Sequence, residues 1–472
     1  MLIQPSLSGD PEQSSPERHP HFATRAVGMF RDLFPIAEPA EPTGPRGRSV
    51  VIQVVAVAIG TIALLLRVPG IPAWHTMYAE DYWLFFPQAL EHPWHLLTPD
   101  GGYIEFVPRL IAQLATYLPL TAAAAAFAVI GALTACGCAL FIFHASAGFI
   151  DSPWLRALLA SALVLLPVTP LEIIDSGVGS PWYLLIALFW AMLWRPRSRT
   201  GMVIAALIGF LTVASTILAV VLVPLLLARV IALRGVREHA VTAGWAAGLL
   251  LQLPFVLQGL GAPGSRAGRL APFDQAVAFY GHDVVLPALG WHLSWWLKSS
   301  VGPDYGMLII GAPLAITFIW AMVTQGRTAG VFVLTALLIG FLEIVVAGTL
   351  TWWVPSDPVL KSFEPGSRYT DLPIFLIDAA LICSLDAFFR RTPIRLRAVT
   401  AVTALVAILA VGWVTDFRYP GGRTAGGGRS VAAWPQISAR WLRACENHPT
   451  GVIEGPTYAG KIAWLPCERL HG

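Results

Sequence analysis

Long apolar stretches recur along the chain, each close to the length that a helix needs to cross a bilayer. A crossing helix takes about 20 residues because the hydrocarbon layer is about 30 Å thick. Only 12% of the 472 residues are charged, whereas a soluble domain is about one quarter charged. The sequence therefore predicts an all-α, polytopic transmembrane protein. Its clear spans are Val50–Leu66, Pro119–Phe143, Leu155–Ile173, Trp182–Trp194, Val241–Leu257, Met307–Val323, Val331–Leu350, Leu372–Phe389 and Ala398–Thr415.

One further apolar stretch, Val203–Leu233, is too long for one span and marginal for two. Basic clusters stand on both sides of it, at 195–199 and at 229–237. Basic loops stay on the cytoplasmic side of a membrane, so the chain between the two clusters must enter the membrane and return. The least apolar point, Val213–Thr216, is the expected turn. Two short spans, or a re-entrant pair with the same parity, bring the expected total to about 11 crossings.

An odd number of crossings places the two ends of the chain on opposite sides of the membrane. The expected organisation is a disordered cytoplasmic leader at 1–48, a transmembrane domain at 49–415 and an extracytoplasmic tail at 416–472. The leader is rich in Pro, Glu, Ser and Arg, as disordered segments are, and has no cleavable signal peptide. The expected location is the cell membrane, with a cytoplasmic N-terminus and the C-terminus outside.

The cysteines agree with this topology. Cys445 and Cys467 lie in the polar tail, and the other three cysteines lie within predicted spans. A cysteine pair forms a disulfide only in an oxidising compartment, which is where the topology places the tail. We expect a Cys445–Cys467 disulfide, and two free thiols are the alternative.

Polar residues collect in the loops expected outside. In the first of these loops, Glu80 and Asp81 precede an amphipathic stretch, Tyr82–His92, that suits a helix on the membrane surface. A Pro-Asp-Gly-Gly turn ending at Tyr103 follows, and then Arg109 at the start of an apolar helix. The expected outer loops are 68–118, 174–181, 258–306 and 351–371.

An acidic pair at the boundary between lipid and water suits general-base chemistry. Low dielectric raises the pKa of a carboxylate, which can then take a proton from an acceptor hydroxyl. Nearby arginines would hold the phosphate of a lipid-linked donor in a bidentate, planar contact. The alternative is that Glu80 and Asp81 only cap the surface helix, where an N-terminal acid is favourable.

These features resemble the GT-C class of membrane glycosyltransferases, in an uncharacterised bacterial branch. An acidic pair after the first of about 11 spans carries the resemblance. Shorter similar segments run from about residue 50 to the end: Asp81-Tyr-Trp-Leu-Phe-Phe-Pro-Gln-Ala-Leu, Pro99-Asp-Gly-Gly-Tyr, Pro108-Arg-Leu, Trp182-Tyr-Leu-Leu, Arg368-Tyr and Trp464-Leu-Pro-Cys.

The resemblance implies inverting transfer of a sugar from a polyprenyl-phosphate donor. The acceptor would be a glycan or glycolipid of the cell envelope, and the donor and membrane lipid would be the other partners. Asp81 or Glu80 would be the base, and Asp81 is preferred because Asp is the commoner base in the class. The chain departs from the class in having a tail of only about 55 residues, which leaves acceptor recognition open.

Two other groups of residues are candidates for substrate binding. Glu172, Asp175 and Trp182 in the second outer loop suit sugar hydroxyls and rings, or serve only as loop solvation and an interfacial aromatic belt. Arg368 and Tyr369 precede the tenth span. An outer arginine runs against the positive-inside rule, so it indicates phosphate binding, with snorkelling as the alternative.

No nucleotide-binding, serine-hydrolase or zinc-protease motif occurs in the sequence. The sequence predicts no cofactor and no metal site, with a divalent ion left open, and the net charge of +3 gives no indication of nucleic-acid binding. A transporter or flippase of a lipid-linked sugar is the main rival, and a non-enzymatic envelope assembly protein is the second. The enzyme hypothesis requires Asp81, Glu80, Arg109 and Arg368 to meet in one cavity.

Overall fold

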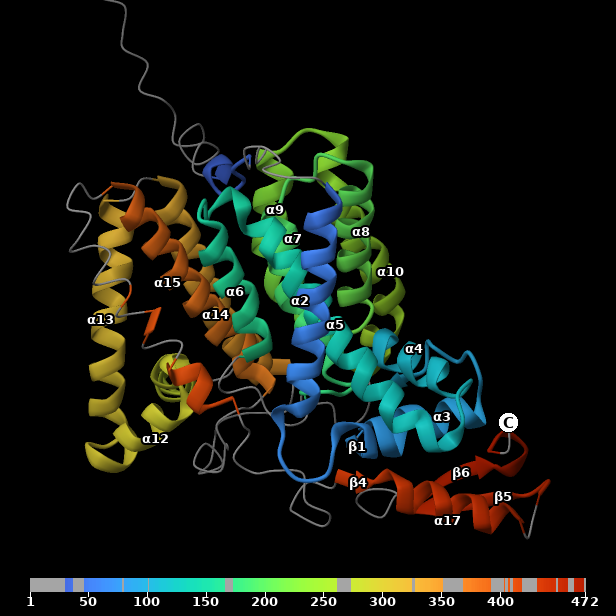
Figure 1. The fold of residues 1–472 in the computed structure, drawn as a ribbon. Helices are drawn as coiled ribbons and strands as arrows, with labels where there is room; N and C mark the ends of the chain where they lie inside the picture. The colour runs from blue at the N-terminus through green and yellow to red at the C-terminus, as the bar shows by residue number, and fades with distance from the viewer. Residues whose placement is uncertain are drawn as a thin grey trace, which may run out of the picture.

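The computed structural model describes most of the chain. The described residues are 30–36, 46–78, 80–100, 102–165, 173–260, 273–324, 327–350, 368–391, 403, 406–407, 411–417, 431–446, 449–456 and 462–470. Within them the fold is a bundle of apolar helices with small polar elements gathered at one end (Figure 1).

Six helices of the described residues are long and apolar enough to cross a membrane. They are α2 (Arg46–Arg67), α5 (Ala123–Ala145), α10 (Ala240–Leu260), α13 (Pro303–Thr324), α14 (Arg327–Leu350) and α15 (Asp371–Arg391).

Five further apolar helices are shorter. They are α4 (Phe106–Ala115), α6 (Pro153–Leu165), α7 (Ser180–Leu193), α8 (Arg199–Val213) and α9 (Val223–Ala232), the last continuing the 3₁₀ turn η5 (Ile217–Leu222). The expected helical class is confirmed, and the six long apolar helices are consistent with a membrane protein. The described helices do not establish the total of 11 crossings, and the expected span Ala398–Thr415 lies mostly outside the described residues.

The helices divide into central and peripheral ones. Of the most apolar 18-residue segment of each helix, 89% is buried within the protein in α15 and 17% in α2. Every residue of α7 from Tyr183 to Leu193 is buried, and α7 packs against α5, α8 and α9. Helices α7 and α15 therefore form the core, while one face of α2 is left for lipid, since a membrane-spanning helix needs no polar outer face.

The chain turns back at the predicted point between α8 and α9. Helix α8 ends at Val213, and the Thr216 hydroxyl caps η5 by accepting the N–H of Leu218. Arg229 at the end of α9 donates to the carbonyl oxygens of Met192 and Glu238. Arg195, which precedes α8, forms an ion pair with Glu238. The ends of α7 and α9 therefore meet the start of α10 (Figure 1), which confirms the expected return.

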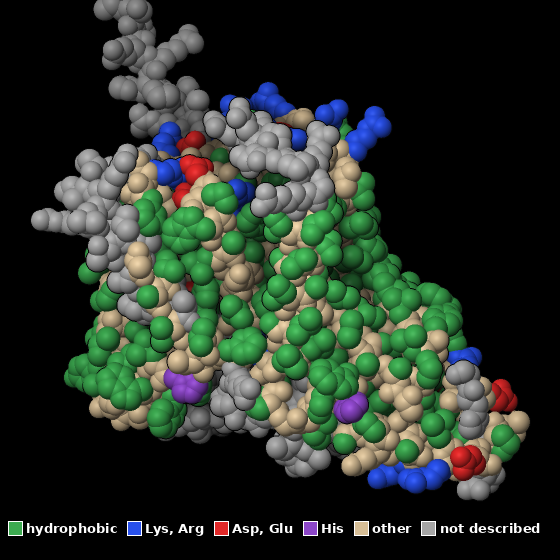
Figure 2. Space-filling view, in the orientation of Figure 1, with side chains coloured by type: hydrophobic (Ala, Val, Ile, Leu, Met, Phe, Trp, Pro, Cys, Tyr) green, Lys and Arg blue, Asp and Glu red, His purple; other side chains and the backbone are tan. Residues whose placement is uncertain are grey.

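These contacts define the basic end of the bundle. Lys and Arg side chains gather there on the visible face, with a broad hydrophobic belt below them and a smaller basic group on the C-terminal tail (Figure 2). Part of the expected disordered leader also packs at this end. Phe34 is 1% exposed and lies under the Arg229 guanidinium at 5.6 Å, because an aromatic face stabilises a cation in a dry site. The rest of 1–48 is largely outside the described residues.

The opposite end, here called the first-loop end, carries most of the irregular elements. The first loop contains η1 (Ala73–His75), β1 (Thr76–Tyr78), the π-helix η2 (Asp81–Phe85), α3 (Phe86–Glu91), β2 (Pro99–Asp100) and β3 (Tyr103–Ile104). The third loop adds α11 (Phe273–Phe279), η7 (Tyr280–Val285), η8 (Leu286–Leu289) and α12 (Trp291–Ser300).

The C-terminal tail folds onto the first loop. Strand β4 (Val431–Ala433) pairs antiparallel with β1, so that Val431 faces Tyr78. Helix α17 (Trp434–Glu446) and the hairpin of β5 (Val452–Pro456) and β6 (Ile462–Pro466) follow. The predicted Cys445–Cys467 disulfide is present. The tail is therefore a small module fastened by a strand pair and closed by a covalent bond.

Trp434 is the main apolar contact between the tail and the first loop. It is 0% exposed, packs edge-on against Tyr82 and Phe86, and donates its indole N–H to the carbonyl oxygen of Leu120. Trp441 stacks on Tyr82 at 6.0 Å and also packs edge-on against Trp434 at 5.4 Å. Two tryptophans of the tail therefore hold the helix that begins at Asp81.

We expect Trp434→Ala to release the tail from the first loop. Truncating a buried tryptophan costs about 3–5 kcal/mol, and here it also leaves the Leu120 carbonyl without its donor. Limited proteolysis of the purified protein should then cleave the tail at least tenfold faster. The matched control is Trp464→Ala, which changes an exposed tryptophan of the same module. Equal cleavage rates for the two variants would contradict the assignment.

Candidate functional site

Asp81 connects the first loop to the second. Its carboxylate accepts the backbone N–H of Gly177 at 2.8 Å and of Val178 at 3.0 Å, and the residue is 1% exposed. A Cβ on Gly177 would lie 2.9 Å from the same carboxylate, so this approach requires glycine. Burial raises the pKa of Asp81 well above its ordinary value, and the two N–H donors oppose that rise. Asp81 therefore acts as an anchor between loops and not as a cap of its own helix.

Glu80, the neighbouring acid, faces the start of α15. Its carboxylate lies 3.9 Å from the Arg368 guanidinium in η10 (Arg368–Thr370), and both side chains are partly exposed. No side-chain cap joins Glu80 to η2, so helix capping does not explain this residue either. The structure thus brings together two residues that are almost 290 positions apart in the sequence, as the enzyme hypothesis requires.

Aromatic side chains border the Glu80–Arg368 pair. Arg368 lies over the Tyr369 ring at 5.5 Å, and Tyr369 packs edge-on against Trp182 at 5.3 Å. Trp182 belongs to the first turn of α7, so the second loop contributes to the same place as η10. Aromatic faces of this kind suit the apolar faces of sugar rings, and guanidinium groups suit phosphate.

Glu105 is a further acid in this region, and the sequence analysis did not single it out. It directly precedes α4, and its own backbone carbonyl accepts the N–H of Arg109 at 3.2 Å. Burial, with the charges of Asp100 and Glu80 beside it, raises the pKa of Glu105 to about 8, against the opposing charges of Arg368 and Arg109. Such a group exchanges a proton near neutral pH, as a general acid or base must.

Tyr103 lies within electrostatic range of Glu105, and the charge of Arg368 acts on both residues. Burial and the Glu105 charge raise the pKa of Tyr103, and Arg368 opposes that rise. In the sequence, Glu105 is marked only by its position after a Gly-Gly turn and before an apolar helix. That signal is weak because nothing local shows that the β2–β3 hairpin folds toward Arg368.

Asp175 occupies a neighbouring buried position. It is 7% exposed, has a left-handed backbone with φ of 55°, and lies within electrostatic range of Arg67 and Tyr183. Arg67 itself donates to the carbonyl oxygens of Val164 and Phe417. Arg67 therefore joins the end of α2 to α6, and its charge acts on Asp175 of the second loop. Glu172 lies outside the described residues, so its predicted role stays a prediction.

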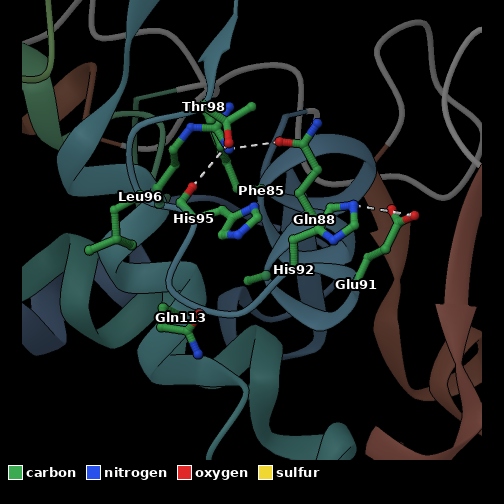
Figure 3. A pocket seen from close by; sticks show the side chains of 10 residues that line it. Phe85, Gln88, Glu91, His92, His95, Leu96, Thr98 and Gln113 are labelled. Carbon is green, nitrogen blue, oxygen red and sulfur yellow. Dashed lines mark hydrogen bonds and ion pairs between the residues drawn. The ribbon is translucent and has the colours of Figure 1, made fainter.

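Arg109 does not join the Glu80–Arg368 pair. It donates to the Gln88 side chain at 2.7 Å and lies over the Phe85 ring at 5.4 Å, on the wall of a cavity beside α3 (Figure 3). Its charge acts on two acids of this end, Glu105 and Asp100. Of the four residues expected to share one cavity, Glu80 and Arg368 lie together, and Arg109 lines a cavity that neither of them lines.

In the described part of the chain, no group of three or more His, Cys, Asp or Glu side chains is arranged to hold a metal ion. Neither a protein-family model nor a curated protein matches this sequence.

We expect Glu105→Gln to flatten the pH dependence of stability. The folded pKa of about 8 exceeds the ordinary value of 4.5, so the neutral carboxyl stabilises the fold. That contribution is complete below about pH 4.5 and is lost as the pH rises through about 8. Thermal unfolding of the detergent-solubilised protein between about pH 4 and 9 measures it, and glutamine stays neutral throughout. Parallel curves for the variant and the wild type would show that Glu105 ionises normally.

Proposed function

We propose that this protein is a membrane glycosyltransferase of the GT-C type. It would move a sugar from a polyprenyl-phosphate donor to a cell-envelope glycan or glycolipid. The pairing of Glu80 with Arg368 carries the proposal, because it sets a carboxylate beside a guanidinium at one end of a membrane-length bundle. Trp182 and Tyr369 border that pair with aromatic faces.

The distribution of charge supports an extracytoplasmic site. Arg195 and Arg229 lie at the basic end, whereas Glu80 and Arg368 lie at the first-loop end. By the positive-inside rule the basic end faces the cytoplasm, so the first loop and the disulfide-closed tail face the oxidising side. A disulfide is stable in that compartment.

In the proposed reaction Glu80, and not Asp81, is the base. Both Asp81 oxygens already accept backbone N–H groups, and the residue is almost fully buried. Glu80 would take the proton of the acceptor hydroxyl as its oxygen attacks the anomeric carbon of the sugar. The bond from that carbon to the phosphate oxygen breaks, and the polyprenyl phosphate leaves with its charge held by Arg368. Glu105 would receive or return a proton near neutral pH.

A transporter of a lipid-linked sugar is the second candidate, and two buried acids favour it. Asp378 in α15 and Glu343 in α14 are 0% exposed, and their carboxyl oxygens have no hydrogen-bond partner among the described residues. Ionisable groups at such depth mark ion or proton pathways in transporters. Under that mechanism Asp378→Asn would abolish function and Glu80→Gln would spare it.

We expect Glu80→Gln to reduce sugar transfer by about 10²–10⁴-fold, the usual contribution of a general base. A deletion strain is complemented with each variant, and its polyprenyl-phosphate sugars and envelope glycans are compared by mass spectrometry. The unused donor should accumulate in the deletion strain and with Glu80→Gln. The control, Glu446→Gln, changes an exposed acid of the tail and should restore normal glycans. Normal glycans with Glu80→Gln would overturn the proposed mechanism.

A further inference from the structure

A cavity of about 180 Å³ lies between α3 and α4 at the first-loop end (Figure 3). One water molecule needs about 10–15 Å³ by this measure, so the cavity has room for a phosphate-sized group. Gln88, His92, His95 and Arg109 are among its lining residues. Neither Glu80 nor Arg368 lines this cavity.

Arg109 brings a poorly compensated positive charge to this cavity. The residue is 5% exposed, and only its Nη1 has a hydrogen-bond acceptor, the side-chain oxygen of Gln88. Its Nε and Nη2 are buried and have no acceptor in the part of the chain that the structure describes. A buried cation without an anion in contact is unfavourable. Glu105 and Asp100 act on Arg109 through their charges, and an anionic ligand would supply the direct contact that its buried Nε and Nη2 lack.

The other lining side chains do not neutralise Arg109. Glu91 is the one acid among the residues that line the cavity, and its carboxylate lies 3.6 Å from the His92 ring. The His92 and His95 rings stack at 5.3 Å, which places two further nitrogen-bearing rings at the mouth. Both histidines are exposed, so a ligand can reach them from outside.

An apolar rim adjoins the cavity. Trp94, which is 56% exposed, contacts the Tyr117 ring at 6.3 Å, and Tyr117 is 65% exposed. Trp94 is also tied to the lining, because its backbone N–H donates to the Gln113 side chain at 2.6 Å. Trp and Tyr at such a boundary are typical of a membrane interface. Further exposed apolar residues beside them are Leu97, Leu114 and Leu118.

We propose that this cavity binds the phosphate headgroup of a membrane lipid. Arg109 would contact the phosphate oxygens, His92 and His95 would close the mouth, and the acyl or isoprenyl chain would lie along the Trp94–Tyr117 rim. Free phosphate shares the anion chemistry but leaves the rim unused. The site does not depend on the proposed sugar transfer, because neither Glu80 nor Arg368 lines the cavity.

The proposal is tested by measuring how tightly two lipids, phosphatidic acid and phosphatidylcholine, bind to the delipidated, detergent-solubilised full chain. Native mass spectrometry is the readout. We expect phosphatidic acid to bind at least tenfold more tightly than phosphatidylcholine. Arg109→Gln should remove that preference, and the double variant His92→Ala/His95→Ala should weaken it without unfolding, since both side chains are exposed. Arg237→Ala, an exposed arginine near the basic end, is the matched control and should change nothing.

Three outcomes would overturn the site. They are equal binding of the two lipids by the wild type, an unchanged preference in both the Arg109 and the histidine variants, and displacement of phosphatidic acid by equimolar inorganic phosphate. The last result would show a phosphate site that makes no use of the rim. Glu80→Gln should bind phosphatidic acid like the wild type, so failure of the lipid site and failure of the proposed transferase are distinguishable.

Discussion

The carboxylate of Asp81 holds the first-loop end together. By accepting two backbone N–H groups from the second loop, it joins η2 to the segment that leads into α7. Nearly every residue of helix α7 is buried. The Asp81 contact therefore holds the first loop in a defined position relative to the core. The neighbouring Glu80 then points to Arg368, and the start of α15 is brought to the same place. A buried acceptor with two donors is costly to disturb, which is why the geometry of Glu80 depends on Asp81.

The C-terminal module supports the same helix from the other side. Strand β4 pairs with β1 directly before the acidic pair, and Trp434 and Trp441 both pack against Tyr82. Deleting the tail would therefore disturb the proposed site as well as any surface for a partner. Loss of function on tail deletion does not separate an enzyme from an assembly protein, whereas the point variant Glu80→Gln does.

Arg109 and Arg368, which the enzyme hypothesis places at one site, lie at two different sites. Arg368 lies beside Glu80 and an aromatic border, where it suits the phosphate of a reacting donor. Arg109 faces a cavity with an apolar rim, where it suits a lipid that stays bound. Glu105 lies within electrostatic range of both guanidinium groups. Both arginines are near the start of apolar helices in the sequence, so local context alone does not distinguish them.

The sequence by itself determined the membrane class, the return of the chain at Val213–Thr216 and the Cys445–Cys467 bond. Each follows from local quantities: the length of apolar runs, the sign of loop charges and the count of cysteines in one loop. Only the tertiary structure decided that Asp81 is an anchor and that Glu80 faces Arg368. It also decided that Glu105 lies within electrostatic range of that pair, and that the tail covers the first loop. Those results depend on contacts between segments up to about 350 residues apart, and the burial of a carboxylate depends on neighbours that no local pattern specifies.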